Sequence, residues 1–362
     1  MTPTLTRLKA RLFREGLRIP EALWAELGHE GHYKHKRAGL SQGRFFRIED
    51  GDDHTSVNVP VLEPFVERSS LELRRQGDGY AVVADDEVLA PIVPFPWPRW
   101  YDRRTADGRP FHSVVSAHCD TSLYTAIFQN GCGWWTETSK CAFCAMKVDT
   151  TSQWRRIEPI IEVVRAALQE NPRAELSFGG GTTLTPDRST RHKAEAIAAL
   201  KREVDLPVCV EIAPPETDDW LDALHDAGCN SVLMNIEVWD PALRERLMPG
   251  KSVISRERYL AACEHAARTF GRSQVSSQII IGLEPLDQTL EGIRALTEAG
   301  AIPLPVVFRP LPGTPLEDHP VPDLQAIIEV FEATAALMKE ADLDGAETLS
   351  GCALCGACSA HR

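Results

Sequence analysis

The chain has 362 residues, of which 43% are hydrophobic, and its formal net charge is −13. This length suits one large domain with an extension, and the hydrophobic fraction allows a sizeable buried core. The acidic balance argues against nonspecific nucleic-acid binding, and no run of about 18 apolar residues predicts a membrane span. Residues 1–16 contain no apolar segment typical of a signal peptide. Because the cysteines cluster as metal sites do, we expect a reducing, cytoplasmic location.

Residues 1–112 are expected to form a separate α+β region. Apolar residues at helical spacing predict a first helix that ends near Gly16, and Pro20 opens a second that stops at Gly28. The basic, glycine-containing stretch 32–46 is either a solvated loop or an anion-binding substrate loop. Strand patterns follow at 56–62, 71–75 and 79–93, the last with a turn at Asp85-Asp86.

Residues 113–341 alternate strand patterns with helix patterns, which is typical of a parallel sheet with right-handed crossovers. The predicted strands are 123–130, 175–178, 208–212, 231–237, 276–281 and 305–308. The predicted helices are 157–169, 191–203, 217–227, 255–269, 287–299 and 323–340. These six βα units fit either an open doubly wound sheet or a partial barrel, and the pattern does not separate the two.

Three cysteines follow the first of these strands: Cys132, Cys141 and Cys144. Thiolates are soft ligands, so three on one loop select zinc, copper(I) or an iron–sulfur cluster. A structural zinc site would take a fourth ligand from elsewhere in the chain. A [4Fe–4S] cluster held by three cysteines would leave one iron free to bind another molecule.

The segment Cys141-Ala142-Phe143-Cys144 resembles the second half of the cluster loop of the radical SAM (S-adenosylmethionine) superfamily. That loop reads C-x3-C-x2-C, with an aromatic residue before the last cysteine. The first half departs from it, because eight residues separate Cys132 from Cys141. The resemblance implies a partial (β/α)6 barrel with the cluster loop after the first strand, which is where this loop falls.

Looser similarities extend the resemblance along the chain. The proline- and glycine-rich segment 309–314 is similar to one in biotin-synthase-like members of the superfamily. Segments 37–43, 248–262 and 274–285, with the cysteine-rich tail, resemble a radical SAM group associated with nitrilase gene clusters. The chain is therefore identified as a member of the biotin-synthase-like branch, and the nitrilase-associated group is a narrower hypothesis.

The carboxyl ends of the predicted strands carry the residues expected to bind SAM, because ligands of parallel α/β folds bind there. The resemblance implies that a glycine motif holds the methionyl amino group. Gly180-Gly181 match it, with Thr182 in place of the acid, so contact is expected through the backbone. A plain tight turn is the alternative.

Asn235 and Glu237 alternate onto one face of the fourth predicted strand, where they point at the ligand or form a solvent-exposed strand end. The fifth strand resembles the one that flanks adenine. Arg309 could bind a carboxylate or form a surface salt bridge. The residues expected to bind SAM are Gly179, Gly180, Gly181, Thr182, Asn235, Glu237, Gln278, Ile281, Arg309 and Leu311.

A predicted tail, residues 342–362, carries three cysteines with C-x2-C-x2-C spacing: Cys352, Cys355 and Cys358. This ferredoxin-like spacing indicates a second iron–sulfur cluster, with zinc or a redox-active thiol set as alternatives. A fourth ligand would be Cys119, His361 or a substrate. The isolated cysteines are expected in the core: Cys209, Cys229 and Cys263.

The resemblance implies an enzyme that reductively cleaves SAM to a 5′-deoxyadenosyl radical, which takes a hydrogen atom from a small molecule. The expected cofactors are a [4Fe–4S] cluster, SAM and a second iron–sulfur cluster, and the expected partner is an electron donor such as a flavodoxin or ferredoxin. No membrane or nucleic-acid partner is expected, and no catalytic side chain is predicted. Two alternatives stay open: sulfur insertion with the tail cluster as donor, and a non-catalytic metal-binding or electron-transfer protein.

Overall fold

The computed structural model describes residues 3–27, 43–129, 131–146 and 153–361. Its N-terminal part is a five-stranded antiparallel sheet, in the order β2-β1-β5-β4-β3 within these ranges. The strands are β1 (Arg44–Asp50), β2 (Asp53–Val59), β3 (Glu72–Gln76), β4 (Gly79–Ala84) and β5 (Glu87–Pro94). Two helices precede them, α1 (Pro3–Glu15) and α2 (Glu21–Leu27). The predicted helix ends and the turn at Asp85-Asp86 are confirmed, since both aspartates have a positive φ between β4 and β5.

The prediction of a loop over 32–46 is wrong at its end, because β1 begins at Arg44 and pairs with both β2 and β5. Its burial alternates from Arg44 to Ile48, so the strand covers the core with one face. The rest of that prediction falls on residues 32–42, which lie outside the described residues.

The larger sheet has eight strands in the described ranges, in the order β13-β12-β11-β10-β9-β7-β6, with β8 also paired to β7. Six are parallel and follow the chain order. They are β7 (Ser122–Gln129), β9 (Glu175–Gly180), β10 (Val208–Glu211), β11 (Ser231–Leu233), β12 (Val275–Ile281) and β13 (Ile302–Val307). The short strands β6 (Ser116–Ala117) and β8 (Gln153–Trp154) are antiparallel to β7.

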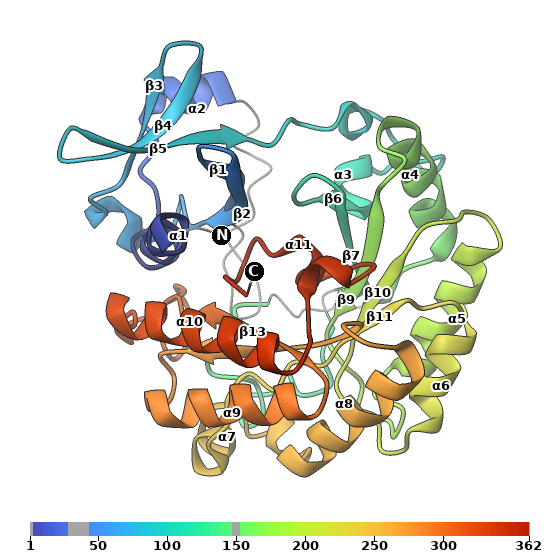
Figure 1. Cartoon of the computed structure of the whole chain (residues 1–362). Coiled ribbons are helices and arrows are strands. Elements are labelled where there is room, and N and C mark those ends of the chain that lie inside the picture. Colours follow the sequence, from blue (N-terminus) through green and yellow to red (C-terminus); the bar gives the residue numbers. More distant parts are fainter. Residues whose placement is uncertain (1–2, 28–42, 130, 147–152, 362) are drawn as a thin grey trace.

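The sequential strand order decides between the two predicted architectures. A doubly wound sheet reverses its strand order, whereas strands in chain order with right-handed crossovers place every helix on one face. Figure 1 shows the helices as an outer ring around the strands. They are α4 (Ile157–Glu170), α5 (Thr190–Lys201), α6 (Asp219–Asp226), α7 (Pro241–Leu247), α8 (Arg256–Phe270), α9 (Leu286–Glu298) and α10 (Leu324–Glu340). In the described residues β13 and β6 end the sheet, so the partial (β/α)6 barrel is confirmed.

Two elements of the barrel differ from their prediction. The fourth strand, β11, stops at Leu233 and does not reach Glu237. Beyond Leu233, Ile236 donates its backbone N–H to the Ser277 hydroxyl instead of to a strand carbonyl. Glu237 has a φ of 68°, which lies outside the range of strand residues. Helix α7 was not predicted. It begins behind an Asp240 side chain that accepts the Leu243 N–H, a standard N-cap followed by proline.

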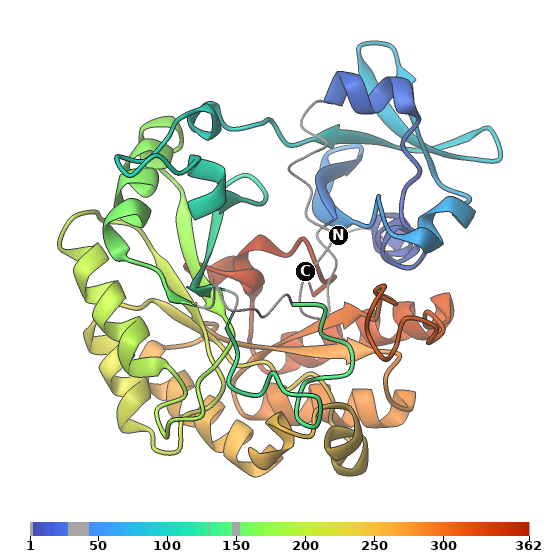
Figure 2. The ribbon, with the colours of Figure 1, turned by 180° about the vertical axis from the view of Figure 1, so that it is seen from behind.

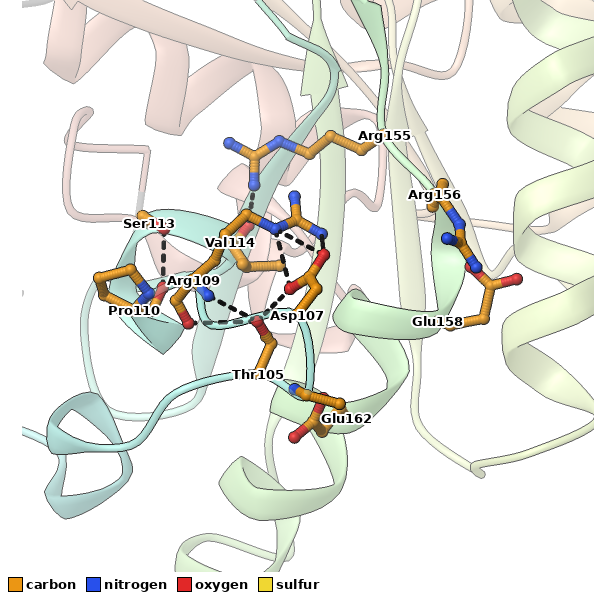
Figure 3. Close-up of polar contacts among 11 residues, drawn as sticks. Thr105, Asp107, Arg109, Pro110, Ser113, Val114, Arg155, Arg156, Glu158 and Glu162 are labelled. Carbon is orange, nitrogen blue, oxygen red and sulfur yellow. Dashed lines mark hydrogen bonds and ion pairs between the residues drawn. The ribbon is translucent and has the colours of Figure 1, made fainter.

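The segment between the two sheets is fastened to the outer face of α4, as Figure 3 shows. The Ala106 N–H donates to a Glu162 carboxylate oxygen at 3.0 Å, and Arg155 donates to the Val114 carbonyl at 2.7 Å. This segment includes α3 (Phe111–Val114) and a 3-10 turn (Arg99–Asp102) that buries Trp100 and Tyr101. The connector is therefore ordered and ends directly at the first barrel strands.

The tail enters the barrel from the amino ends of the strands. The Ser350 and Ser231 hydroxyls lie 2.8 Å apart, and the Gly351 N–H donates to Glu175 at 3.0 Å. Ser231 and Glu175 are the first residues of β11 and β9. The last helix, α11 (Cys352–Cys355), consequently lies within the ring of strands, where both views place it (Figures 1 and 2).

The N-terminal part packs against the same side of the barrel as the end of the tail. Helix α1 packs on α10, where the rings of Phe13 and Phe331 meet edge to face at 6.2 Å. The buried Lys9 ammonium donates to the Gly356 carbonyl at 2.8 Å. The N-terminal part, barrel and tail thus share one continuous core. Within the described residues, no helix is both long and apolar enough to cross a membrane.

Candidate functional site

The first cysteine set lies on the loop that follows β7, at the carboxyl ends of the parallel strands. The Gly133 N–H donates to the Thr182 carbonyl at 2.7 Å, which ties the start of this loop to the segment after β9. The Ala142 N–H donates to the Leu247 carbonyl at 2.7 Å, which ties its end to the last residue of α7. The loop is therefore held from both sides by neighbouring βα units.

Three half-buried thiols meet on this loop: Cys132, Cys141 and Cys144. Withdrawal from water raises the pKa of Cys141 well above its ordinary value, and the nearby Glu237 carboxylate and other two thiols raise it further. The pKa of Cys144 rises to about 12, mainly for the same reason of burial. Without a metal Cys141 and Cys144 stay protonated, because buried thiolates without a cation cost free energy.

The donor set is chemically suited to an iron–sulfur cluster, because thiolates are soft ligands that bind its irons. Among the described residues, no three or more His, Cys, Asp or Glu side chains are placed to hold one metal ion. A tetrahedral zinc site would draw its sulfurs to within about 3.8 Å of one another, given zinc–sulfur bonds of about 2.3 Å. A cluster spreads its thiolate ligands further apart, since each binds a different iron.

The glycines at the end of β9 are required by the close approach of the cysteine loop and β7. A Cβ on Gly181 would overlap the Gly131 carbonyl oxygen and lie 2.7 Å from the Cys132 Cβ. Gly180 has a φ of 110°, which side-chain-bearing residues rarely adopt, and a Cβ there would lie 2.8 Å from the Phe128 carbonyl oxygen. A Cβ on Gly179 would overlap the Tyr124 ring. The glycine motif therefore lets the cysteine loop and β7 approach β9, and Thr182 accepts a loop N–H through its carbonyl.

Asn235 and Glu237 are both withdrawn from solvent, which excludes the solvent-exposed strand end. Asn235 donates to the Glu211 carboxylate at 2.8 Å and accepts the Gln278 backbone N–H at 3.1 Å. Glu237 instead forms an ion pair with Lys251 at 2.6 Å, beside Cys141. Asn235 and Glu237 thus belong to two separate groups of polar side chains. β11 ends at Leu233, so the alternation of a strand does not place the two residues on one face.

Two buried lysines next to the cysteine loop were not predicted. Lys193 of α5 is fully buried and donates to the Glu211 carbonyl at 2.6 Å. Burial lowers the pKa of its ammonium to about 8, and Glu211 and Cys132 are the nearby groups that oppose this. Lys251 follows α7. Neither position carries a local signal of burial, because a lysine on a helix or after it is ordinarily a solvated residue.

An apolar pocket of about 310 Å³ opens beside Ala142, the residue that follows Cys141. Its other walls come from α7 and from the segments after β12 and β13: Arg246, Leu247, Leu283, Pro315, Leu316 and His319. The predicted Ile281 and Leu311 lie behind this pocket in the core, with exposed fractions of 2% and 1%. The pocket is therefore lined by residues that follow the predicted ones along the chain, such as Leu283 and Leu316.

Arg309 and Gln278 point to other parts of the molecule. Arg309 is 1% exposed and donates to the Asn58 carbonyl at 2.8 Å, so the surface salt bridge is wrong. The Gln278 side-chain amide lies 4.0 Å from the Cys352 sulfur of the tail. Both residues lie at the junction of the barrel with the tail and the N-terminal sheet, and their contact with SAM stays a prediction.

The tail cysteines meet a fourth thiol inside the barrel. Cys119 lies in the turn between β6 and β7, and its sulfur is 2.9 Å from the Cys355 sulfur. The isolated cysteines Cys209, Cys229 and Cys263 are buried, as predicted.

Comparison with known proteins agrees with this arrangement. Residues 127–297 match the profile of the radical SAM superfamily. Bacteriochlorophyllide c C-7(1)-hydroxylase of Chlorobaculum limnaeum is 24% identical over 356 residues, covering 91% of this chain and 83% of that protein. Biotin synthase 2 of Corynebacterium diphtheriae is 28% identical over 183 residues, covering 49% of this chain and 53% of that protein. The crystal structure of methylornithine synthase is 17% identical and covers 62% of this chain and 63% of its own, with a TM-score of 0.49.

The barrel, the cysteine loop at its carboxyl edge and the matched profile define a radical SAM protein. Through residues 127–297 this chain belongs to the radical SAM superfamily, and it is an enzyme, similar to a biotin synthase and to a bacteriochlorophyllide hydroxylase. The predicted membership and the predicted enzymatic nature are confirmed. The similarity to the nitrilase-associated group stays a prediction.

Proposed function

We propose that this enzyme binds a [4Fe–4S] cluster through Cys132, Cys141 and Cys144 and uses SAM for radical chemistry on a small molecule. The convergence of three half-buried thiols at the carboxyl ends of the parallel strands carries the proposal. When bound, the reduced cluster and SAM would supply a 5′-deoxyadenosyl radical that takes a hydrogen atom from a C–H bond. The protein's part is to bind, orient and exclude water.

The chain's own residues hold the loop for this task. Backbone hydrogen bonds from Gly133 and Ala142 anchor its two ends, and Gly250 donates to the Ser139 carbonyl at 3.0 Å near its middle. The Lys251–Glu237 ion pair closes the side of the loop next to Cys141. These contacts keep the three sulfurs together in a place of low water content.

Two neighbouring features would bind SAM. Glu211, Asn235 and Lys193 form a polar group beside Cys132, which would receive the charged methionyl end together with the backbone after Gly180. The apolar pocket beside Ala142 would receive the adenine ring. Both lie next to the cysteine loop, on its two sides.

The substrate would be a small molecule bound within the barrel. The net charge of −13 argues against nucleic acid as the substrate. The two curated relatives are named for different reactions, so they define no common substrate. We also propose a flavodoxin or ferredoxin as electron donor and a reducing compartment, because the ligand thiols must stay reduced to bind iron.

The test is reconstitution of the chain with iron and sulfide without oxygen, followed by SAM and dithionite. We expect 5′-deoxyadenosine from the wild type and none from Cys132→Ala, Cys141→Ala or Cys144→Ala. Cys263→Ala removes a buried thiol from α8 and should leave the activity unchanged. Deoxyadenosine formation at the wild-type rate by any of the three loop variants would reject the ligand assignment.

Sulfur insertion with the tail as donor stays the second candidate, because the tail cysteines lie inside the barrel. Measuring sulfide per chain before and after turnover separates the two. Loss of sulfide in proportion to product would support donation, and constant sulfide over several turnovers would exclude it.

A further inference from the structure

The tail brings its cysteines to a thiol that is remote in sequence. Cys119 and Cys355 are 236 residues apart, yet their sulfurs lie 2.9 Å from each other. Both thiols are free, and this separation exceeds a disulfide bond of about 2.05 Å. The contact unites the turn before β7 with α11, so Cys119 belongs to the same group of sulfurs as the tail.

The other two tail cysteines belong to this group as well. Cys352 and Cys355 are the first and last residues of α11, three positions apart and therefore on one face of that turn, and Cys358 follows three residues later. Cys358 packs against the apolar cluster around Phe143 that also receives Cys141 and Cys144. Four sulfurs are thus gathered on the inner side of the barrel, near the first cysteine set and separate from it.

Polar groups from the surrounding elements are directed at these sulfurs. The Asn58 side-chain amide, from strand β2, donates to the Cys358 sulfur at 3.3 Å. The Gln278 amide, from β12, donates to the Cys352 sulfur at 4.0 Å. The Lys9 ammonium holds the carbonyl of Gly356, next to Cys355. Donors and a cation suit thiolates, since a protonated thiol is a weak acceptor.

We propose that Cys119, Cys352, Cys355 and Cys358 hold a second iron–sulfur cluster, with all four ligands supplied by the protein. A cluster would take the place of the direct contact between the Cys119 and Cys355 sulfurs. It would leave no iron open, in contrast to the three-cysteine set, so a substrate would not bind to this cluster through iron.

Cys119 is a better fourth ligand than His361. The His361 Nε2 lies 2.9 Å from the Ala353 carbonyl, and a Cβ added at Gly345 would meet it. Cys119 already touches a tail sulfur, whereas His361 contacts backbone.

The test isolates this second site from the first. In a background carrying Cys132→Ala, Cys141→Ala and Cys144→Ala, anaerobic reconstitution should load about four irons and four sulfides per chain. Adding Cys119→Ala should remove at least half of that iron or convert the electron paramagnetic resonance signal to that of a three-iron cluster. Adding Cys229→Ala, which removes a buried thiol two residues before β11, is the matched control and should change neither.

The outcomes separate this proposal from SAM cleavage, because no measurement uses SAM turnover. Full iron and an unchanged signal in the Cys119→Ala variant would overturn the fourth ligand. No iron in the background variant, one zinc per chain, or a Cys119–Cys355 disulfide in anaerobically purified wild type would overturn the cluster.

A second measurement applies if Cys119→Ala fails to fold, as circular dichroism would show. The reduced background variant is then mixed with cyanide, which binds an open iron. An unchanged resonance signal supports four protein ligands, and a shifted signal overturns them.

Discussion

The Glu237 carboxylate lies 2.6 Å from the Lys251 ammonium, and both side chains are largely buried, with exposed fractions of 14% and 11%. Burial by itself lowers the pKa of Lys251, but Glu237, together with Tyr259 and Cys141, outweighs it and the net pKa is raised. The pair stands beside Cys141, where it also influences that thiol. An unbalanced charge here would act directly on the first cysteine set.

Lys251→Met should therefore destabilise the fold by about 3–5 kcal/mol, because it leaves Glu237 buried without a cation. The double variant Lys251→Met/Glu237→Gln should recover most of that loss, since neither charge remains. Urea unfolding of the metal-free chain gives both values. Equal stability of the single variant and the wild type would show that the ion pair contributes nothing to the fold.

Gly181→Ala should lower iron binding at the first cysteine set by at least half. The added Cβ meets the Gly131 carbonyl and the Cys132 Cβ, so the loop must move away from β9. Iron content and the resonance signal of the first cluster report the effect. Gly79→Ala is the control, because a Cβ there lies 3.8 Å from its nearest neighbour. Normal iron loading in Gly181→Ala would mean that the loop tolerates the methyl group.

Asn58→Leu should make the reduction potential of the tail cluster more negative. The variant removes the hydrogen bond to the Cys358 sulfur, and such bonds stabilise the reduced, more negative form of a cluster. The backbone contacts of Asn58 with Ala357 and Arg309 do not depend on its side chain. A redox titration followed by paramagnetic resonance measures the potential. A potential equal to that of the wild type would argue that this amide does not reach a cluster ligand.

Glu175 should make the metal-free fold less stable as pH rises. Burial raises the pKa of this carboxyl from about 4.5 to about 8. Between these values the unfolded chain has lost the proton and the folded chain keeps it, so raising the pH favours unfolding. Glu175→Gln should reduce this loss of stability with rising pH. Urea unfolding at several values from about pH 5 to 8, between the two pKa values, measures the free energy of unfolding. A wild-type slope in the variant would assign the pH dependence to other groups.

Much of the fold and part of the site could be predicted from local patterns. The six βα units were recognised because apolar periodicity reports which residues face a core, whatever the core is. The cysteine loop was recognised because ligand spacing is also local. The prediction failed where the chain leaves its pattern: β11 stops at Leu233, and the cap at Asp240 starts a helix that no prediction included.

The alternation of strands and helices, the two cysteine sets and the chemistry expected of thiolates at a strand end can all be read from the residues in order. Which distant groups meet became known from the folded chain alone. Arg309 lies against Asn58, Gln278 faces Cys352, and Cys119 touches Cys355 across 236 residues. The physical reason is that local propensity depends on neighbours along the chain, whereas these contacts arise when the tail enters the barrel and the N-terminal sheet covers its side.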